Sequence, residues 1–246
     1  MAESHDVQVE GGESVAAVHH GASAASDDWL FFCHGFRSDK SGSYERRCER
    51  AVEEGYRAVR FDFRGSGESD RAFVDATLSS RIADLRAVLD YFDPEAYALF
   101  GSSFGAKVAL HAACEGPSGA NTSGHDRLRA VVGRAPLTYN RAFEEYRDLV
   151  AEAGTLQIDD DHAIDEGFFE DFDRYDFVDV AAGVDVPVAL FHGTDDASVP
   201  LTDSLEAAAA LETDVLLQKY RGEGHVFSEA AEARLLCQTF DWLATV

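Results

Sequence analysis

Lysine is nearly absent from this chain. It occurs only at Lys40, Lys107 and Lys219, and arginine supplies the other basic groups. Lys and Arg together number 21 against 46 Asp and Glu, which gives a formal net charge of −25. Proteins that bind nucleic acid need a basic patch to neutralise phosphates. The shortage of positive charge therefore argues against a nucleic-acid partner.

Long hydrophobic runs and paired cysteines are also missing. No apolar stretch approaches the roughly 18 residues of a membrane helix. The first residues, MAESHDVQVEGG, contain neither a basic cluster nor an apolar stretch, so we expect no signal peptide, a cytoplasmic location and no membrane partner. The four cysteines lack C-x-x-C spacing, which predicts free thiols and neither a zinc site nor a disulfide framework. They are Cys33, Cys48, Cys114 and Cys237.

Negative charge is what the chain has in excess. Two like charges about 30 Å apart repel by roughly 0.1 kcal/mol in unscreened water. The sum over all pairs reaches tens of kcal/mol as an upper bound, against a typical folding stability of about 5–15 kcal/mol. At 1 M salt the Debye length is about 3 Å and this repulsion nearly vanishes. The acidic, lysine-poor composition resembles that of proteins from salt-accumulating, halophilic archaea; an acidic protein from a low-salt organism is the alternative.

Apolar runs alternate with amphipathic segments along the 246 residues. Strands are predicted at 7–18 (a hairpin about Gly11-Gly12), 29–36, 56–63, 97–101, 128–136, 186–193 and 214–220. Helices are predicted at 44–55, 80–92, 104–116, 203–212 and 228–246. The alternation predicts an α/β fold in a single domain of residues 1–246, with a mostly parallel, doubly wound sheet and helices on both faces. Ligands of such sheets bind at the carboxyl ends of the strands.

One acidic and aromatic segment, at about 139–176, interrupts the alternation. Its position between two strands predicts a small helical cap over the strand ends. We expect most of its aromatic side chains to form the core of this cap and some to face a substrate. They are Phe168, Phe169, Phe172, Tyr175 and Phe177.

The sequence Gly101-Ser-Ser103-Phe-Gly105 follows a predicted strand and precedes a predicted helix, which is the context that the G-x-S-x-G motif requires. The turn is so tight that larger side chains two positions either side of the serine would clash. The helix N-terminus beneath Ser103 favours developing negative charge. Taken alone, the motif also fits a tight turn whose serine has no catalytic role.

Three further loops favour a nucleophile. CHGF ends an earlier strand, so the Phe36 N–H and the Phe104 N–H are candidate oxyanion donors. FHGTDDASVP ends a later strand with an acid, and GEGHVF carries His225 before the last helix. A serine needs a base to remove its proton, and the histidine needs an acid to fix its tautomer. The order serine, acid, histidine is typical of one architecture.

These motifs, from Trp29 to Trp242, resemble the α/β-hydrolase superfamily. Within it they are most similar to the small serine esterases and acyl hydrolases, which include bacterial cinnamoyl and feruloyl esterases and related peptidase-like hydrolases. FDFRGSGES resembles the loop after that family's fourth strand. The family pattern His-Gly-x-x-Asp-x-x-Val-Pro implies that Asp196, and not Asp195, is the acid. One departure is Gly105-Ala106, where family members usually have Gly-Gly.

The expected triad is therefore Ser103, Asp196 and His225. The expected activity is hydrolysis of a carboxylic ester with an apolar or aromatic part, through an acyl-enzyme, without cofactor or metal. Thioesters and peptides remain open as substrates, and so does the oligomeric state. A non-catalytic ligand-binding protein of the same fold is the alternative from another class. A serine nucleophile argues against the dehalogenase and epoxide-hydrolase branches, which use aspartate.

Other motifs indicate less. RGSGESD resembles a dinucleotide fingerprint, but the third glycine is missing and Asp70 would repel a pyrophosphate. The run 159–161 of three aspartates is interpreted as a solvated loop in preference to a cation site. His19-His20 is assigned to a polar loop without a metal-ligand partner. His34 is interpreted as a residue that orients its loop, not as a second base.

Overall fold

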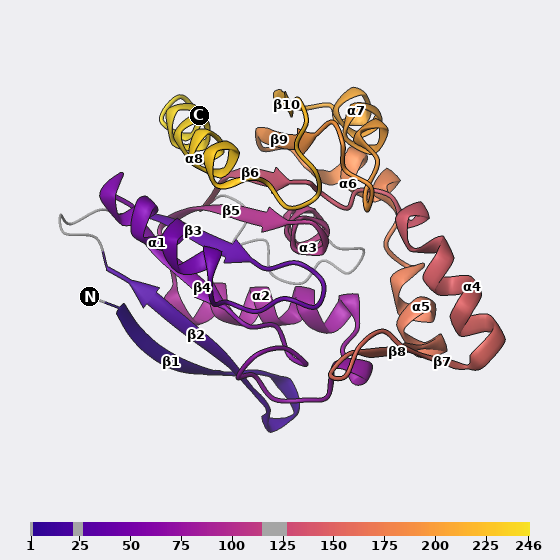
Figure 1. Ribbon diagram of the computed structural model, residues 1–246. Helices are drawn as coiled ribbons and strands as arrows, with labels where there is room; N and C mark the ends of the chain where they lie inside the picture. The colour runs from indigo at the N-terminus through magenta and orange to yellow at the C-terminus, as the bar shows by residue number, and fades with distance from the viewer. Residues whose placement is uncertain (1, 22–26, 115–126) are drawn as a thin grey trace.

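A computed structural model describes residues 2–21, 27–114 and 127–246. Over these residues, eight strands form one sheet in the order β1-β2-β4-β3-β5-β6-β9-β10 (Figure 1). The strands are β1 (Ala2–Gln8), β2 (Ser14–His20), β3 (Asp28–Cys33), β4 (Arg57–Phe61), β5 (Ala96–Ser102), β6 (Leu128–Arg134), β9 (Val188–Gly193) and β10 (Val215–Tyr220). β2 pairs antiparallel with β1 and β4, and the other pairs are parallel. The predicted mostly parallel α/β sheet is confirmed.

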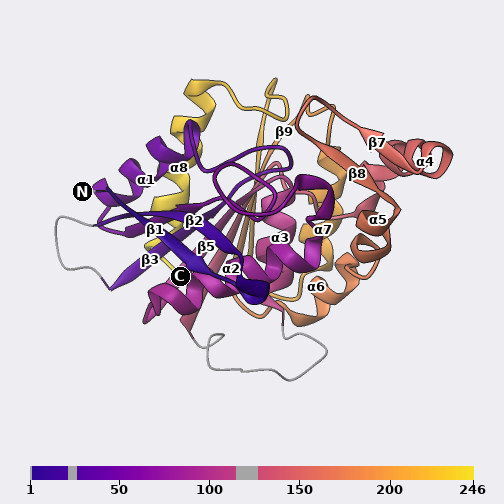
Figure 2. The same ribbon diagram turned by 90° about the horizontal axis from the view of Figure 1, so that it is seen from below.

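Helices cover both faces of this sheet (Figures 1 and 2). One face carries α1 (Ser43–Glu53) and α8 (Glu229–Leu243); the other carries α2 (Leu78–Phe92), α3 (Phe104–Ala113), α6 (Phe177–Gly183) and α7 (Leu201–Ala210). The core accordingly divides into two clusters. In β5, Tyr97 and Leu99 belong to one cluster, and Ala98 and Phe100 to the other. A strand buried on both faces has no polar side to show, which explains its continuous apolar run.

The strand registers bring the carboxyl ends of the central strands to one edge. Cys33 pairs with Gly101, Ser102 pairs with Arg134, and Gly193 pairs with Tyr220. The loops that follow β3, β5, β9 and β10 therefore emerge side by side. In Figure 1 the arrowheads of β3, β5 and β6 point towards the side on which α4 (Glu144–Ala153) and α5 (Glu166–Phe172) lie.

The segment 139–176 lies at this edge and is not purely helical. It contains η4 (Asn140–Phe143), α4 (Glu144–Ala153), a hairpin of β7 (Thr155–Gln157) and β8 (Ala163–Asp165), and α5 (Glu166–Phe172). The prediction of helices alone was wrong for the hairpin. Strands of three residues are too short for a period of two to stand out in a sequence.

Some boundaries differ from the predictions. β3 ends at Cys33, short of the predicted 36, because His34 begins a loop. His19 and His20 lie in β2, so their assignment to a polar loop was wrong. The helix predicted at 104–116 ends at Ala113, and residues 115–116 lie outside the described residues.

Two predictions from absent features can be compared with the structure. The four cysteines are free, and all except Cys237 are buried. Across residues 2–21, 27–114 and 127–246, no helix combines the length and apolarity needed to cross a bilayer.

Candidate active site

Ser103 lies in a strained turn between β5 and α3. Its backbone has φ +52° and ψ −116°, in a region that residues other than glycine rarely adopt. A Cβ at Gly101 would lie 2.3 Å from Ala106 Cα, and a Cβ at Gly105 would lie 2.2 Å from the Cys33 carbonyl oxygen. Both glycines are therefore required by crowding, as the motif predicts. The turn accommodates the unusual Ala106, whose N–H donates to the Ser103 carbonyl at 3.0 Å.

The structure brings Ser103, His225 and Asp196 into one hydrogen-bonded chain. His225 Nε2 lies 3.0 Å from Ser103 Oγ, and His225 Nδ1 lies 2.8 Å from Asp196 Oδ2. The three side chains come from the loops after β5, β10 and β9, which meet at the carboxyl edge of the sheet. Both distances allow proton transfer from serine to imidazole with the carboxylate behind it.

The Asp196 carboxylate is fully buried and held from several sides. The N–H groups of Ser198 and Val199 donate to Oδ1 at 2.8 and 2.9 Å, and His192 Nε2 lies 3.3 Å from Oδ2. Burial alone would raise the pKa of Asp196. The hydrogen bonds from His192 and His225 outweigh it and hold this pKa well below its usual range. Asp196 therefore stays ionised beside His225.

Asp195 has a different environment, although it is the adjacent residue. Its side chain is exposed and accepts a hydrogen bond of 2.8 Å from the Thr194 hydroxyl. Successive residues leaving a strand point in different directions, so only one of the two aspartates faces His225.

The loop after β3 passes directly beside the serine. A Cβ at Gly35 would lie 3.6 Å from Ser103 Cβ. Within the described part of the chain, the N–H groups of Phe36 and Phe104 meet no backbone acceptor. Phe104 is the first residue of α3, where the N–H groups have no partner within the helix. Both predicted donors therefore remain available to a ligand.

His34 holds this loop in place. Its Nε2 accepts the Phe63 N–H at 3.1 Å, and its Nδ1 donates to the Gly35 carbonyl at 2.9 Å. Burial lowers the pKa of His34 to about 4, so the ring is neutral near pH 7. Both ring nitrogens are occupied, which supports the interpretation of His34 as a loop-orienting residue.

Arg134 connects Ser103 to His225 and was missed by the sequence analysis. Its carbonyl accepts the Ser103 N–H at 2.9 Å, and its Nη1 donates to the His225 carbonyl at 2.7 Å. Behind it, Glu232 accepts from Arg47 Nε at 2.5 Å and lies 3.9 Å from Arg134 Nε. The only sequence signal was that Arg134, like Ser102, ends a central strand.

An aromatic cluster lies beside the loop after β3, which carries Phe36. The Phe36 ring packs against Phe73, Phe104, Phe143 and Phe168, with centroids 5.1–5.7 Å apart. Four of the predicted cap aromatics are buried, and Tyr175 is partly buried against them. The four are Phe168, Phe169, Phe172 and Phe177. These rings form the apolar surroundings of the site.

Comparison with known proteins shows the family of the chain. Residues 43–246 match the model of the prolyl oligopeptidase family. The chain belongs to this family. It is a hydrolase of the α/β-hydrolase superfamily. Human mitochondrial palmitoyl-protein thioesterase ABHD10 is 25% identical over 228 residues, covering 86% of this chain and 71% of the relative. A non-heme chloroperoxidase of Streptomyces lividans is 24% identical over 254 residues, covering 84% and 83%.

Solved structures share the fold of this hydrolase over its whole length. A putative hydrolase from Agrobacterium vitis S4 superposes with a TM-score of 0.80 at 25% identity, covering 100% of this chain and 98% of the other. Est1E from Butyrivibrio proteoclasticus, solved with ferulic acid bound, gives 0.83 at 18% identity, covering 98% and 100%. The second likeness shows the fold alone.

The loop FDFRGSGES of this hydrolase folds around the buried carboxylate of Asp62. Asp62 accepts hydrogen bonds from Lys40 Nζ at 2.6 Å and from the Glu68 N–H at 2.8 Å. A Cβ at Gly67 would lie 2.1 Å from the Asp62 carboxylate, so this glycine is required by packing. The glycines of the loop therefore serve the fold.

The aspartates at 159–161 also interact with protein groups or with solvent. Asp159 accepts from His162 Nδ1 at 2.6 Å and from Arg37 Nη1 at 3.0 Å, while Asp160 and Asp161 are exposed. The interpretation as a solvated loop fits this arrangement. Arg37 follows Phe36 directly, so the ion pair joins the β7–β8 hairpin to the loop after β3.

Proposed function

We propose that this chain is a serine hydrolase that cleaves carboxylic esters through an acyl-enzyme intermediate. Ser103 Oγ attacks the carbonyl carbon while His225 Nε2 takes its proton. The N–H groups of Phe36 and Phe104 stabilise the oxyanion. His225 returns the proton to the departing alkoxide and then activates the water that releases the acid. Asp196 keeps the proton of neutral His225 on Nδ1, so that Nε2 can accept.

The hydrogen-bonded chain from Ser103 through His225 to Asp196 is the observation that carries this proposal. It coincides with the strained backbone at Ser103, and strain of this kind persists where the surrounding structure enforces it. A ligand-binding protein without catalysis would need neither feature. No step requires a cofactor or a metal.

The aromatic cluster beside Phe36 favours an ester with an apolar or aromatic part, as in the cinnamoyl and feruloyl esterase group. A thioester is the second candidate, because a palmitoyl-protein thioesterase is among the relatives. Both reactions use the same groups. A thiol has a pKa of about 8.5, so a thiolate leaves with less help from His225 than an alkoxide requires. Peptide cleavage, which the family name describes, makes the strongest demand on His225 as an acid.

Labelling with a fluorophosphonate tests the nucleophile. We expect the wild-type chain and Ser102→Ala to be labelled, and Ser103→Ala to be folded but unlabelled. Ester hydrolysis should fall by about 10³-fold or more in Ser103→Ala, as is usual when a triad member is lost. Labelling of Ser103→Ala would contradict the assignment. A panel of p-nitrophenyl esters, acyl thioesters and a prolyl p-nitroanilide, compared by kcat/KM, would rank the three substrate classes.

We further propose that the protein is adapted to high salt, because a net charge of −25 repels itself strongly at low ionic strength. The Tm should rise from about 0.1 M to beyond 1 M salt as the Debye length shortens. A Tm that stays flat across this range would refute halophilic adaptation and leave the hydrolase proposal intact. The expected cytoplasmic location stays a prediction.

A further inference from the structure

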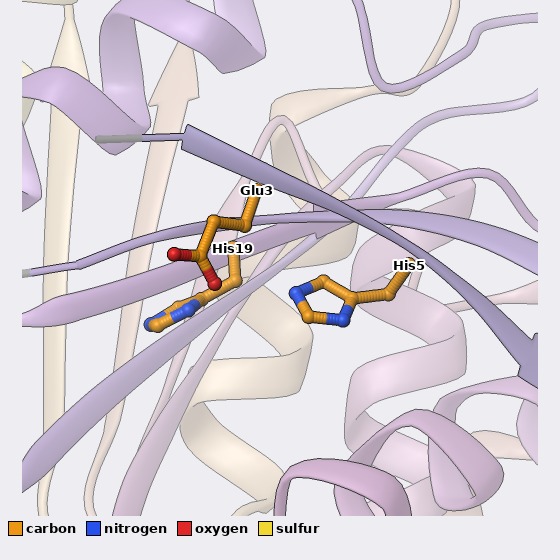
Figure 3. Close-up of side chains that lie close together, drawn as sticks. All are labelled: Glu3, His5 and His19. Atoms are coloured by element: carbon orange, nitrogen blue, oxygen red, sulfur yellow. The ribbon is translucent and has the colours of Figure 1, made fainter.

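Three metal-ligating side chains lie on one face of the β1–β2 ribbon. Glu3 pairs directly with His19 across the two antiparallel strands, and His5 pairs with Ala17. Side chains two residues apart share a face of a strand, and directly paired residues face the same side. Glu3, His5 and His19 are therefore gathered by the register. Figure 3 shows the His5 ring pointing towards the Glu3 carboxylate and the His19 ring.

The two imidazoles hold buried nitrogens without partners. Within the described part of the chain, Nε2 of His5 and Nε2 of His19 are both inaccessible to solvent and meet no hydrogen-bonding atom. A buried polar atom left unpaired is costly and needs an explanation. His20, whose side chain points to the other face of β2, is satisfied, because its Nε2 accepts from Arg60 Nε at 3.0 Å.

Neighbouring groups orient both rings. His5 Nδ1 lies 3.2 Å from the Tyr91 hydroxyl, and a proton on Nδ1 leaves a lone pair on Nε2. His19 is stacked on Trp29, with centroids 5.0 Å apart and planes at 21°. The Phe92 ring contacts both imidazoles, at centroid distances of 5.1 and 5.7 Å. Metal-ligating histidines are commonly held in this way by a second hydrogen bond and by packing.

We propose that Glu3, His5 and His19 bind a divalent transition-metal ion such as zinc. One potential ligand atom from each residue lies within 4.8 Å of the other two. Ligand atoms around tetrahedral zinc are about 3.4 Å apart, so binding requires these atoms to approach one another by at most about 1.4 Å. Glu3 is exposed and can move, and a water would supply the fourth ligand. Two imidazoles and a carboxylate suit zinc better than magnesium or calcium.

This site is structural and separate from the active site. Trp29, on which His19 is stacked, is near the start of β3, whereas Ser103 lies beyond the carboxyl ends of the strands. A bound ion would tie β1 to β2 and, through Tyr91, to the end of α2. Glu3 and His5 lie beside His19, so the expectation that no potential metal ligand is near His19 was wrong. His5 and His19 form no local motif in the sequence, and only the strand register brings them together.

Zinc titration of the untagged full chain tests the site. The chain is stripped with a chelator, dialysed and titrated with ZnCl₂ in excess MgCl₂, which occupies sites made of carboxylates alone. We expect one tight equivalent by calorimetry. We also expect a Tm rise of about 5–10 °C when free zinc is a hundred times Kd. Substitution with Co²⁺ should give the visible absorption of a low-symmetry nitrogen and oxygen site.

Matched variants distinguish zinc binding at this site from unspecific zinc binding by the acidic surface. Glu3→Gln and His19→Gln should each weaken zinc binding by more than about tenfold. Asp6→Asn, which removes the same charge from an exposed position of β1, and His162→Gln should bind as the wild type does. Glu3 is exposed, so Glu3→Gln carries the test even where His19→Gln disturbs folding. A wild-type chain without zinc-dependent Tm, or a Glu3→Gln chain with wild-type affinity, would overturn the proposal.

Discussion

Two regions lie over the carboxyl ends of the strands and are held by different forces. The triad framework, meaning the loops that carry Ser103, Asp196 and His225, is fixed by close backbone contacts. A Cβ at Gly193 would lie 2.2 Å from the Glu223 carbonyl oxygen, and Gly101 and Gly105 are as crowded. The cap, residues 139–176, is fixed by ring packing and by ion pairs near the surface, such as Arg37–Asp159.

The different forces in the framework and the cap suit two different tasks, the positioning of catalytic groups and the recognition of substrate. Catalytic groups lose about 10²-fold in rate when they are misplaced by about 1 Å, so a framework without space for a methyl group protects the rate. Apolar packing tolerates substitution when its volume is kept, so a cap of phenylalanines can change shape at little cost. We therefore expect the framework to control kcat and the cap to control which substrate binds.

The largest expected effect comes from the buried acid. In Asp196→Asn, the amide oxygen still accepts the hydrogen bonds from the N–H groups of Ser198 and Val199. The NH₂ group of the amide then faces His225 Nδ1. The ring proton must move to Nε2, which can no longer accept from Ser103. We expect kcat to fall by roughly 10⁴-fold. Steady-state kinetics on one activated ester in high salt measures it.

Asp195→Asn is the matched control for this substitution. Its side chain is exposed, so kcat should change by less than about tenfold. If Asp195→Asn shows the large loss of kcat, the acid of the triad is Asp195 and not Asp196. If neither variant is impaired, the acid comes from another strand.

The same contrast explains what the sequence predicts and what it does not. Close backbone contacts leave glycines and His-Gly pairs in the sequence, so Ser103 and His225 could be proposed before the structure. The choice of Asp196 over Asp195 comes from the resemblance to the hydrolase family pattern. Ring packing leaves only an aromatic composition, which fits helices and the β7–β8 hairpin equally well. The contacts of Arg134 and the pairing of Glu3 with His19 depend on register between distant segments, which one sequence does not reveal.

A smaller loss is expected from Arg134→Met. Arg134 positions His225 by donating to its backbone carbonyl at 2.7 Å. A shift of the His225 loop by about 1 Å should lower kcat by about 10²-fold with little change in KM. Arg134→Lys should recover part of the rate, because an ammonium group can also donate to that carbonyl. Arg129→Met, at the one exposed position of the same strand, is the control. A lower Tm with unchanged kcat would reduce Arg134 to a structural role.

The cap can be tested through the one buried lysine beneath it. Lys107 Nζ donates to the Tyr175 carbonyl at 2.9 Å and lies 5.1 Å from the Phe172 ring centroid. Burial lowers the pKa of Lys107 from 10.5 to about 7. Between these values the unfolded chain holds a proton that the folded chain lacks. The free energy of unfolding therefore rises with pH, by at most about 1.4 kcal/mol per unit.

Lys107→Met should remove this contribution. Its stability relative to the wild type should be greatest near pH 7 and should decline towards pH 10, as urea unfolding at three pH values would measure. His111, one turn along α3, has its pKa lowered to about 3 by burial and does not titrate in this range. Lys219→Met, at an exposed position of β10, should keep the wild-type slope. Equal slopes for wild type and Lys107→Met would mean that Lys107 keeps its proton under the cap.

The smallest expected effect concerns the ion pair that joins cap and framework. Arg37 and Asp159 are 3.0 Å apart, and their side chains are 39% and 40% exposed. Pairs of this kind contribute about 0–1 kcal/mol. Asp159→Asn should therefore raise KM for a bulky aromatic ester by less than about fivefold, while kcat for an acetyl ester stays unchanged.

At 1 M salt the difference in KM should vanish, because the Debye length falls to about 3 Å. Asp160→Asn, which removes the adjacent exposed charge, controls for general electrostatics. A tenfold loss of kcat on the acetyl ester in Asp159→Asn would show that the cap acts on the chemistry itself, and the separation of the two regions would fail.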